Sequence, residues 1–140
     1  MAQDDKLERL HEMWMFAGCS KKDLAAVGRA ADEVRVPAGT VLTTEGGSGH
    51  EFCLILDGTA AVRRGKRKVA TLTAGQYFGE LSLLDGQPRS ATVVAESDIH
   101  LLVLGRREFS ALLVTIPSMG QKMMEAMAAR LRAADRKSYP

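Results

Sequence analysis

The chain has 140 residues, 46% of them hydrophobic and 26% charged, and a formal net charge of +2. This length and composition suit a single globular domain, expected over residues 1–140, and the charge is too small to indicate nucleic-acid binding by itself. The N-terminus does not read as a signal peptide, no apolar run is long enough to span a membrane, and the two cysteines lack a metal-type spacing. We therefore expect a cytoplasmic protein.

Helices are expected at both ends of the chain. Apolar residues at helical spacing predict N-terminal helices over about 4–31, the first covering 4–16 and the second following Ser20 as its N-cap. The helical period returns over about 106–136, where Pro117 separates two C-terminal helices.

Between these helices, residues 33–104 form short apolar segments separated by glycine turns. The segment "EFCLILDG" alternates, which places Phe52, Leu54 and Leu56 on one face of a strand and Cys53 and Ile55 on the other. The Asp57-Gly58 pair that follows is typical of a hairpin turn. The pattern indicates a mainly β fold with flanking helices, a double-stranded β-helix (jelly-roll) barrel.

The stretch "GQYFGELSLLDGQPRSATVVA" (residues 75–95) places a lone Glu and a lone Arg between apolar runs. Glu80 begins a short predicted helix over about 80–84, and Gly79 before it lets the backbone approach a ligand closely. The N–H groups at that helix start and the donor fork of Arg89 suit a phosphate. Ser90 adds a hydroxyl, whereas Glu80 suits a ligand hydroxyl. A sugar phosphate with a free hydroxyl satisfies both demands.

"FGELSLLDGQPRSATVVA" resembles the phosphate-binding cassette of cyclic nucleotide-binding domains, found in catabolite-activator-type regulators, protein kinase A regulatory subunits and cyclic-nucleotide-gated channels. "EGGSGHEFCLILDGTAAV" resembles the glycine-bearing strand pair of the same family, and the similarity extends over about residues 8–135. It implies that Glu80 binds the ribose 2′-hydroxyl and that Arg89 binds the cyclic phosphate. The supporting groups that it implies are Ser90 and the backbone N–H groups near Gly79, Leu81 and Ala91.

The resemblance also bears on the base. In activator-type members, hydroxyl residues late in the last helix reach the adenine, whereas the matching residues here are Arg132, Ala133, Ala134 and Asp135. Base contacts are therefore expected elsewhere, with apolar capping by Met127, Leu131 or a neighbouring residue as the candidates. A hydroxyl residue after the arginine occurs in family members that prefer either purine, so Ser90 favours cAMP only weakly. The expected ligand is therefore cAMP, with cGMP as the alternative. No cofactor or metal is expected.

The resemblance implies a sensor rather than an enzyme. The nucleotide would order the cassette and shift the helices after Gly105, which would act on an effector protein or on a homodimer formed through the C-terminal helix. No nucleophile–base pair supports catalysis. A cupin-type metal enzyme shares the β-roll, but it needs two close histidines and a carboxylate, and His50 with Glu51 supplies only one of each.

Two other functions stay open. The chain could be the N-terminal regulatory fragment of a catabolite-activator-type transcription regulator. It stops at Pro140, where a helix-turn-helix would begin, so we expect no direct DNA binding from this chain. It could also be a dimerisation module whose pocket no longer binds. The methionines of the last helix suit a dimer seam, a ligand lid or plain packing: Met119, Met123, Met124 and Met127.

Three further features are interpreted as structural. "RRGKRK" (residues 63–68) straddles a predicted hairpin tip, where charge is usually solvated. Cys53 lies inside a strand and is expected to be a buried thiol. The basic residues that end the last helix are interpreted as a solvated face: Arg130, Arg132, Arg136 and Lys137.

Overall fold

The computed structural model describes residues 3–138. This part of the chain begins with helix α1 (Gln3–Glu12), the 3-10 turn η1 (Trp14–Phe16) and helix α2 (Lys21–Ala30). The strands are β1 (Asp32–Val36), β2 (Val41–Thr43), β3 (Glu51–Asp57), β4 (Ala60–Arg64), β5 (Arg67–Leu72), β6 (Tyr77–Phe78), β7 (Thr92–Ala95) and β8 (Ile99–Gly105). The short helix α3 (Glu80–Asp85) lies between β6 and β7, and α4 (Arg106–Thr115) and α5 (Pro117–Ser138) come last.

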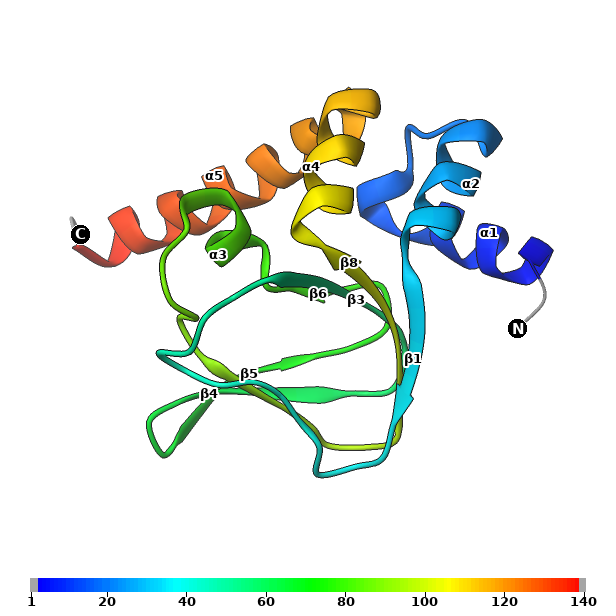
Figure 1. The fold of residues 1–140 in the computed structure, drawn as a ribbon. Coiled ribbons are helices and arrows are strands. Elements are labelled where there is room, and N and C mark those ends of the chain that lie inside the picture. The colour runs from blue at the N-terminus through cyan, green and yellow to red at the C-terminus, as the bar shows by residue number, and fades with distance from the viewer. Residues whose placement is uncertain (1–2, 139–140) are drawn as a thin grey trace.

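The strands form two antiparallel sheets with the orders β1-β8-β3-β6 and β2-β7-β4-β5. Strands from opposite ends of the roll pair with each other, β1 with β8 and β2 with β7. Figure 1 shows the two sheets facing each other, with the N-terminal helices and α4 and α5 gathered on the outer side of the first sheet. This arrangement confirms the mainly β jelly-roll fold with flanking helices, although the two sheets stay separate and do not close into one barrel.

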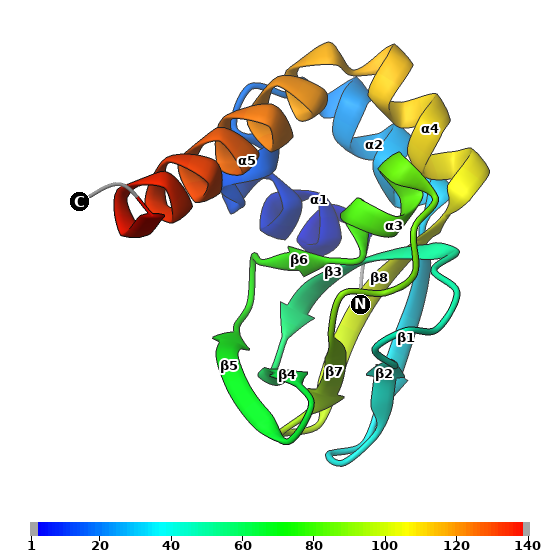
Figure 2. The same cartoon turned by 90° about the vertical axis from the view of Figure 1, so that its left-hand side faces the viewer.

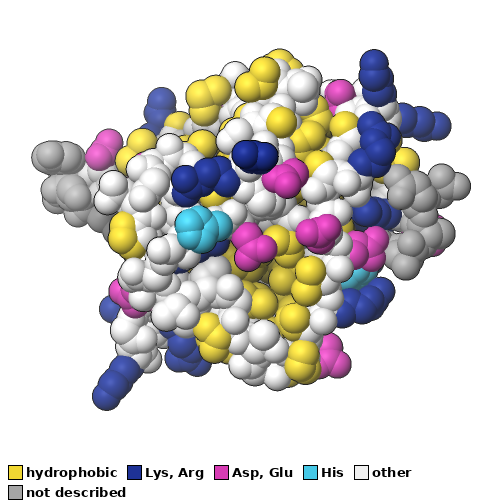
Figure 3. All heavy atoms as spheres, viewed as in Figure 1, with side chains coloured by type: hydrophobic (Ala, Val, Ile, Leu, Met, Phe, Trp, Pro, Cys, Tyr) yellow, Lys and Arg dark blue, Asp and Glu magenta, His cyan; other side chains and the backbone are white. Residues whose placement is uncertain are grey.

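The first sheet is the middle of three layers. Phe52 stacks on Phe109 of α4 in the core between this sheet and the helices, with ring centroids 4.9 Å apart. A second core lies between the two sheets and includes Ile55 and Leu101. Hydrophobic side chains are visible between the sheets on the face in Figure 3, because some members of this core are only partly buried.

Strand β3 has a covered face on each side, which explains its uninterrupted burial from Phe52 to Leu56. The side chains expected on one face, Phe52, Leu54 and Leu56, belong to the core beneath the helices. Those expected on the other face, Cys53 and Ile55, belong to the core between the sheets. The predicted alternation is therefore confirmed, and it divides the strand between two cores.

The prediction of one helix over residues 4–16 is wrong for its last four residues. α1 ends at Glu12, Met13 is extended, and a 3-10 turn follows. Met13, Met15 and Phe16 are all buried in the same core, whereas Trp14 is half exposed. The chain therefore leaves the α-helix at Met13, and the 3-10 turn places both Met15 and Phe16 in the core.

The prediction of a hairpin at Asp57-Gly58 is also wrong. The chain does turn there, with Gly58 at a φ of 98°. However, β3 and β4 belong to different sheets and do not pair. The turn instead passes the chain from one sheet to the other, and a Cβ at Gly58 would lie 2.5 Å from the carbonyl oxygen of Asp98.

Two helix predictions agree with the structure. Ser20 caps α2, accepting from the Asp23 N–H while Asp23 accepts from the Ser20 N–H. α5 buries Met119 and Met123 in the core, whereas its residues 128–136 are all exposed.

None of the helices within residues 3–138 has both the length and the apolarity needed to cross a membrane.

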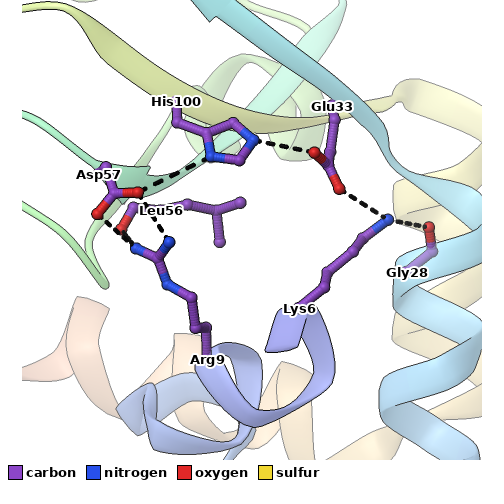
Figure 4. A network of polar contacts seen from close by, with 7 residues as sticks. All are labelled: Lys6, Arg9, Gly28, Glu33, Leu56, Asp57 and His100. Carbon is purple, nitrogen blue, oxygen red and sulfur yellow. Dashed lines mark hydrogen bonds and ion pairs between the residues drawn. The ribbon is translucent and has the colours of Figure 1, made fainter. Parts of the chain in front are cut away.

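Two basic side chains of α1 attach it to the first sheet (Figure 4). Lys6 donates to the carbonyl oxygen of Gly28 at 3.0 Å and lies 3.6 Å from a carboxylate oxygen of Glu33. Arg9 donates to both carboxylate oxygens of Asp57, each at 2.7 Å, and to the carbonyl of Leu56. These contacts fix the N-terminal helix against β1 and β3.

His100 of β8 lies between the two carboxylates of this network (Figure 4). The ring is 2% exposed, and its Nε2 is 3.0 Å from Glu33 Oε2. Its Nδ1 has no hydrogen-bond partner in the described part of the chain and lies 3.9 Å from a carboxylate oxygen of Asp57. The histidine therefore joins the two anchor points of α1.

Candidate functional site

A cavity of about 380 Å³ opens at one side of the sandwich, a size that suits a small ligand. Figure 2 shows α3 and β6 on one side of this region, β4, β5 and β7 on the other, and the C-terminal half of α5 above. The six cassette residues singled out in the sequence all line it: Gly79, Glu80, Leu81, Arg89, Ser90 and Ala91. The fold therefore gathers these residues at one cavity.

Gly79 connects β6 to α3 in a conformation that few other residues adopt. Its φ is 95°, and it precedes the first helical residue, Glu80. A Cβ at this position would lie 2.5 Å from the carbonyl oxygen of Glu51 and 2.7 Å from Nη1 of Arg89. Glycine is therefore required both for the backbone turn and for the close approach of Arg89.

Arg89 is 9% exposed and is held by main-chain acceptors rather than by a carboxylate. Its Nη1 donates to the carbonyl oxygen of Gly79 at 2.9 Å, and its Nη2 donates to that of Glu51 at 2.7 Å. The backbone N–H of Arg89 donates to Gly47 at 2.8 Å. The other guanidinium N–H groups have no acceptor within residues 3–138. They are available to an anion in the cavity.

Glu80 carries an unmet hydrogen-bonding demand at the same cavity. The residue is 4% exposed, and its Oε2 has no hydrogen-bond partner among residues 3–138. Its Oε1 accepts from Nη1 of Arg130 at 3.3 Å. A buried acceptor without a donor is unfavourable, and a ligand hydroxyl would satisfy it.

The phenol of Tyr77 lies beside this carboxylate and also lines the cavity. Burial and then the negative charge of Glu80 raise the pKa of Tyr77, while Arg130 acts in the opposite direction. The phenol therefore remains a neutral hydrogen-bonding group at physiological pH.

The sequence predicts Arg130 on a solvated face, and this prediction is correct for its exposure but incomplete for its contacts. It lines the cavity and pairs with Glu80, although its side chain is 59% exposed. The two residues belong to α5 and α3, so no local sequence pattern connects them. The only signal in the sequence was its position between the two candidate capping residues.

Met127 and Leu131, the predicted capping residues, do not line the cavity. Leu131 is 66% exposed and Met127 is partly buried. Arg130 is the residue of α5 that reaches the cavity wall. Contact of Met127 or Leu131 with a bound base stays a prediction.

The histidines do not gather into a metal site. No three His, Cys, Asp or Glu side chains in the described part of the chain could hold a metal ion together. His50 is exposed beside the glycine loop, whereas His100 is buried in the network that anchors α1.

The family model of the cyclic nucleotide-binding domain matches residues 33–115. The match covers more than half of the chain and includes both β-sheets and the whole cassette. The chain therefore belongs to the cyclic nucleotide-binding domain family.

Relatives and solved structures agree with this assignment. The chain is 37% identical over 106 residues to a cAMP-dependent protein kinase regulatory subunit of Aspergillus niger, an alignment that covers 74% of this chain and 26% of that protein. It thus spans about a quarter of that relative's length. The fold is similar to the catabolite activator protein of Thermus thermophilus, with a TM-score of 0.81, 30% identity and coverage of 88% of this chain and 60% of that one. It is also similar to a cyclic nucleotide-binding domain from Methylobacillus flagellatus, with a TM-score of 0.73 and 30% identity. That match covers 97% of this chain and 79% of the other.

Proposed function

We propose that the protein is a cyclic nucleotide sensor and that its ligand is cAMP. The observation that carries this proposal is the pairing of two unmet demands in one cavity. Glu80 presents a buried oxygen without a donor, and Arg89 presents a buried guanidinium without a carboxylate partner. A ribose hydroxyl next to a cyclic phosphate supplies the missing donor and the missing anion together.

In this proposal Arg89 binds the phosphate through its remaining donors, with Ser90 and the N–H groups near Leu81 and Ala91 beside it. Glu80 accepts from the 2′-hydroxyl through Oε2 while Arg130 keeps Oε1. The assignment of cAMP is supported by the relatives, which are cAMP-dependent protein kinase regulatory subunits. By analogy with them, a bound nucleotide would act through a partner protein rather than through catalysis.

The moving part in this proposal is the C-terminal half of α5. Residues 128–136 are exposed, and the only hydrogen bond or ion pair from them to the rest of the described chain joins Arg130 to Glu80. A ligand bound against Glu80 contacts the anchor of this segment directly. It shifts the helix to the extent that it binds one of two helix positions more tightly.

The proposal is tested by isothermal titration of the wild-type protein with cAMP, cGMP and 5′-AMP. The expected result is binding of cAMP at least tenfold tighter than 5′-AMP, because a noncyclic phosphate with an extra charge does not fit the same donors. Tighter binding of cGMP than of cAMP would support the sensor function but would make cGMP the ligand. Absence of binding by all three would contradict the proposal and favour a dimerisation module.

A further inference from the structure

The cavity has one polar wall and one apolar wall. The polar wall holds Glu80 and Arg89, to which the proposed function assigns the ribose and the phosphate. The opposite wall comes from β4 and β5 and presents Val62, Val69, Ala70 and Leu72. Only the base remains to be placed, and its flat apolar face suits that wall. This inference therefore rests on the proposed function and deepens it.

Arg64, the last residue of β4, is the charged side chain on this second wall. It makes no hydrogen bond or ion pair with any residue in the described range. The two other basic residues that line the cavity are engaged, because Arg130 pairs with Glu80 and Arg89 donates to the carbonyl oxygens of Gly79 and Glu51. Within the described part of the chain, Arg64 is thus a cavity cation whose side chain has no hydrogen-bond or ion-pair partner.

The opposite partner of Arg64 in the hairpin provides a contrast. Arg67 pairs with Arg64 in the β4–β5 register and is also exposed, but it does not line the cavity. The basic hairpin was interpreted as solvated, and its tip does lie between these two residues. Both arginines are exposed, as that interpretation expects, but it does not account for the place of Arg64 at the cavity.

We propose that Arg64 clamps the base of the bound nucleotide by laying its guanidinium over the ring, while the ring rests against the apolar wall of β4 and β5. A planar guanidinium stacks well on an aromatic face, and the attraction is electrostatic as well as dispersive. Stacking uses a surface that every base has, and larger rings offer more of it. Arg64 therefore strengthens binding of both purines and does not choose between them.

The test is isothermal titration of Arg64→Ala, Arg64→Lys and the control Arg67→Ala with cAMP, cGMP and cCMP. Arg67→Ala removes the same charge from the same hairpin. We expect Arg64→Ala to weaken cAMP and cGMP by a similar factor of about 5 to 30, and cCMP by less. Lysine, which lacks the planar group, should restore less than half of the loss in binding free energy. Arg67→Ala should stay within about twofold of wild type.

Three results would overturn the inference. Unchanged affinity in Arg64→Ala shows that Arg64 does not contact the base. Equal losses in Arg64→Ala and Arg67→Ala show that the hairpin attracts the anion only through its charge. A loss confined to cGMP shows recognition of a base edge rather than a face. Each leaves the proposed function intact, whereas failure of the wild type to bind any of the three nucleotides ends both.

Discussion

Arg130 of α5 and Glu80 of α3 are 50 residues apart in the chain, yet Nη1 of the arginine lies 3.3 Å from Oε1 of the glutamate. The contact has different surroundings at its two ends, because the Glu80 side chain is 6% exposed and that of Arg130 is 59% exposed. Such a contact gives little stability. Its importance is positional, since it joins the exposed end of α5 to the cavity wall.

Replacing Arg130 with alanine should release the exposed end of α5 and leave the fold intact. Hydrogen exchange should become faster in residues 128–136 and remain unchanged in β3 and β8. Affinity for cAMP should fall by roughly three- to tenfold, because the charge of Glu80 near the phosphate is no longer offset. Arg132→Ala is the control, because Arg132 is exposed and its side chain makes no hydrogen bond or ion pair within the described range. Unaltered exchange in Arg130→Ala would show that the contact does not hold the helix.

The role of Glu80 is testable with a ligand that lacks the group it is proposed to bind. Wild-type protein should bind 2′-deoxy-cAMP at least tenfold more weakly than cAMP, since Oε2 then stays unsatisfied. In Glu80→Ala the two ligands should bind with nearly equal affinity, as determined by titration calorimetry. A full 2′-hydroxyl preference that persists in Glu80→Ala would place the hydroxyl contact elsewhere.

The network that anchors α1 makes the free energy of unfolding depend on pH. The hydrogen bonds from Arg9 lower the pKa of Asp57 below its ordinary value. Burial works against ionisation of Glu33, but the hydrogen bond with His100 and the charge of Lys6 outweigh it and lower the pKa of Glu33 as well. Their contribution is therefore fully present above about pH 4.5 and is lost as the pH falls through the lowered folded-state values.

This dependence predicts the behaviour of Asp57→Asn in urea unfolding between pH 7 and pH 2.5. The variant should be less stable than wild type at pH 7, and its stability should fall less steeply below pH 4.5, because one of the two linked carboxylates is gone. Asp135→Asn, which changes an exposed residue of α5, should follow the wild-type curve. If the free energy of unfolding fell equally steeply below pH 4.5 in wild type and in Asp57→Asn, Asp57 would not contribute to the pH dependence.

Both cysteines should resist alkylation in the folded protein. Burial raises the pKa of the Cys53 thiol to about 12. Burial also raises the pKa of Cys19, against the effect of its contact with Ser118. Iodoacetamide at pH 8, followed by intact mass spectrometry, should label both thiols in denaturant and Cys53 least without it. Rapid native labelling of Cys53 would mean that the core between the sheets opens readily.

The parts predicted correctly from the sequence are those fixed by neighbouring residues. The alternation of β3 and the cap at Ser20 are local patterns with one physical solution. The cassette residues from Gly79 to Ala91 gather at one cavity for a similar reason, because one short helix and one loop connect them, while their contacts with a ligand stay a prediction.

The parts that failed depend on contacts between distant segments. The end of α1 at Glu12 is set by the core that Met15 and Phe16 enter, which no helical period reveals. The Asp57-Gly58 pair predicts a hairpin because no local pattern indicates that the next strand belongs to another sheet. Arg130 was missed for the same reason, since its partner lies on a different helix.

Titration of wild type and Arg89→Ala with cAMP tests the central assignment most directly. Removing the buried guanidinium should cost about 2–5 kcal/mol, a loss of roughly 30-fold to several thousand-fold in affinity. Arg89→Lys should also bind weakly, because a single ammonium does not reproduce the fork of donors. The thermal unfolding of each variant shows that it is folded. Wild-type affinity in folded Arg89→Ala would contradict the assignment of this cavity as the nucleotide site.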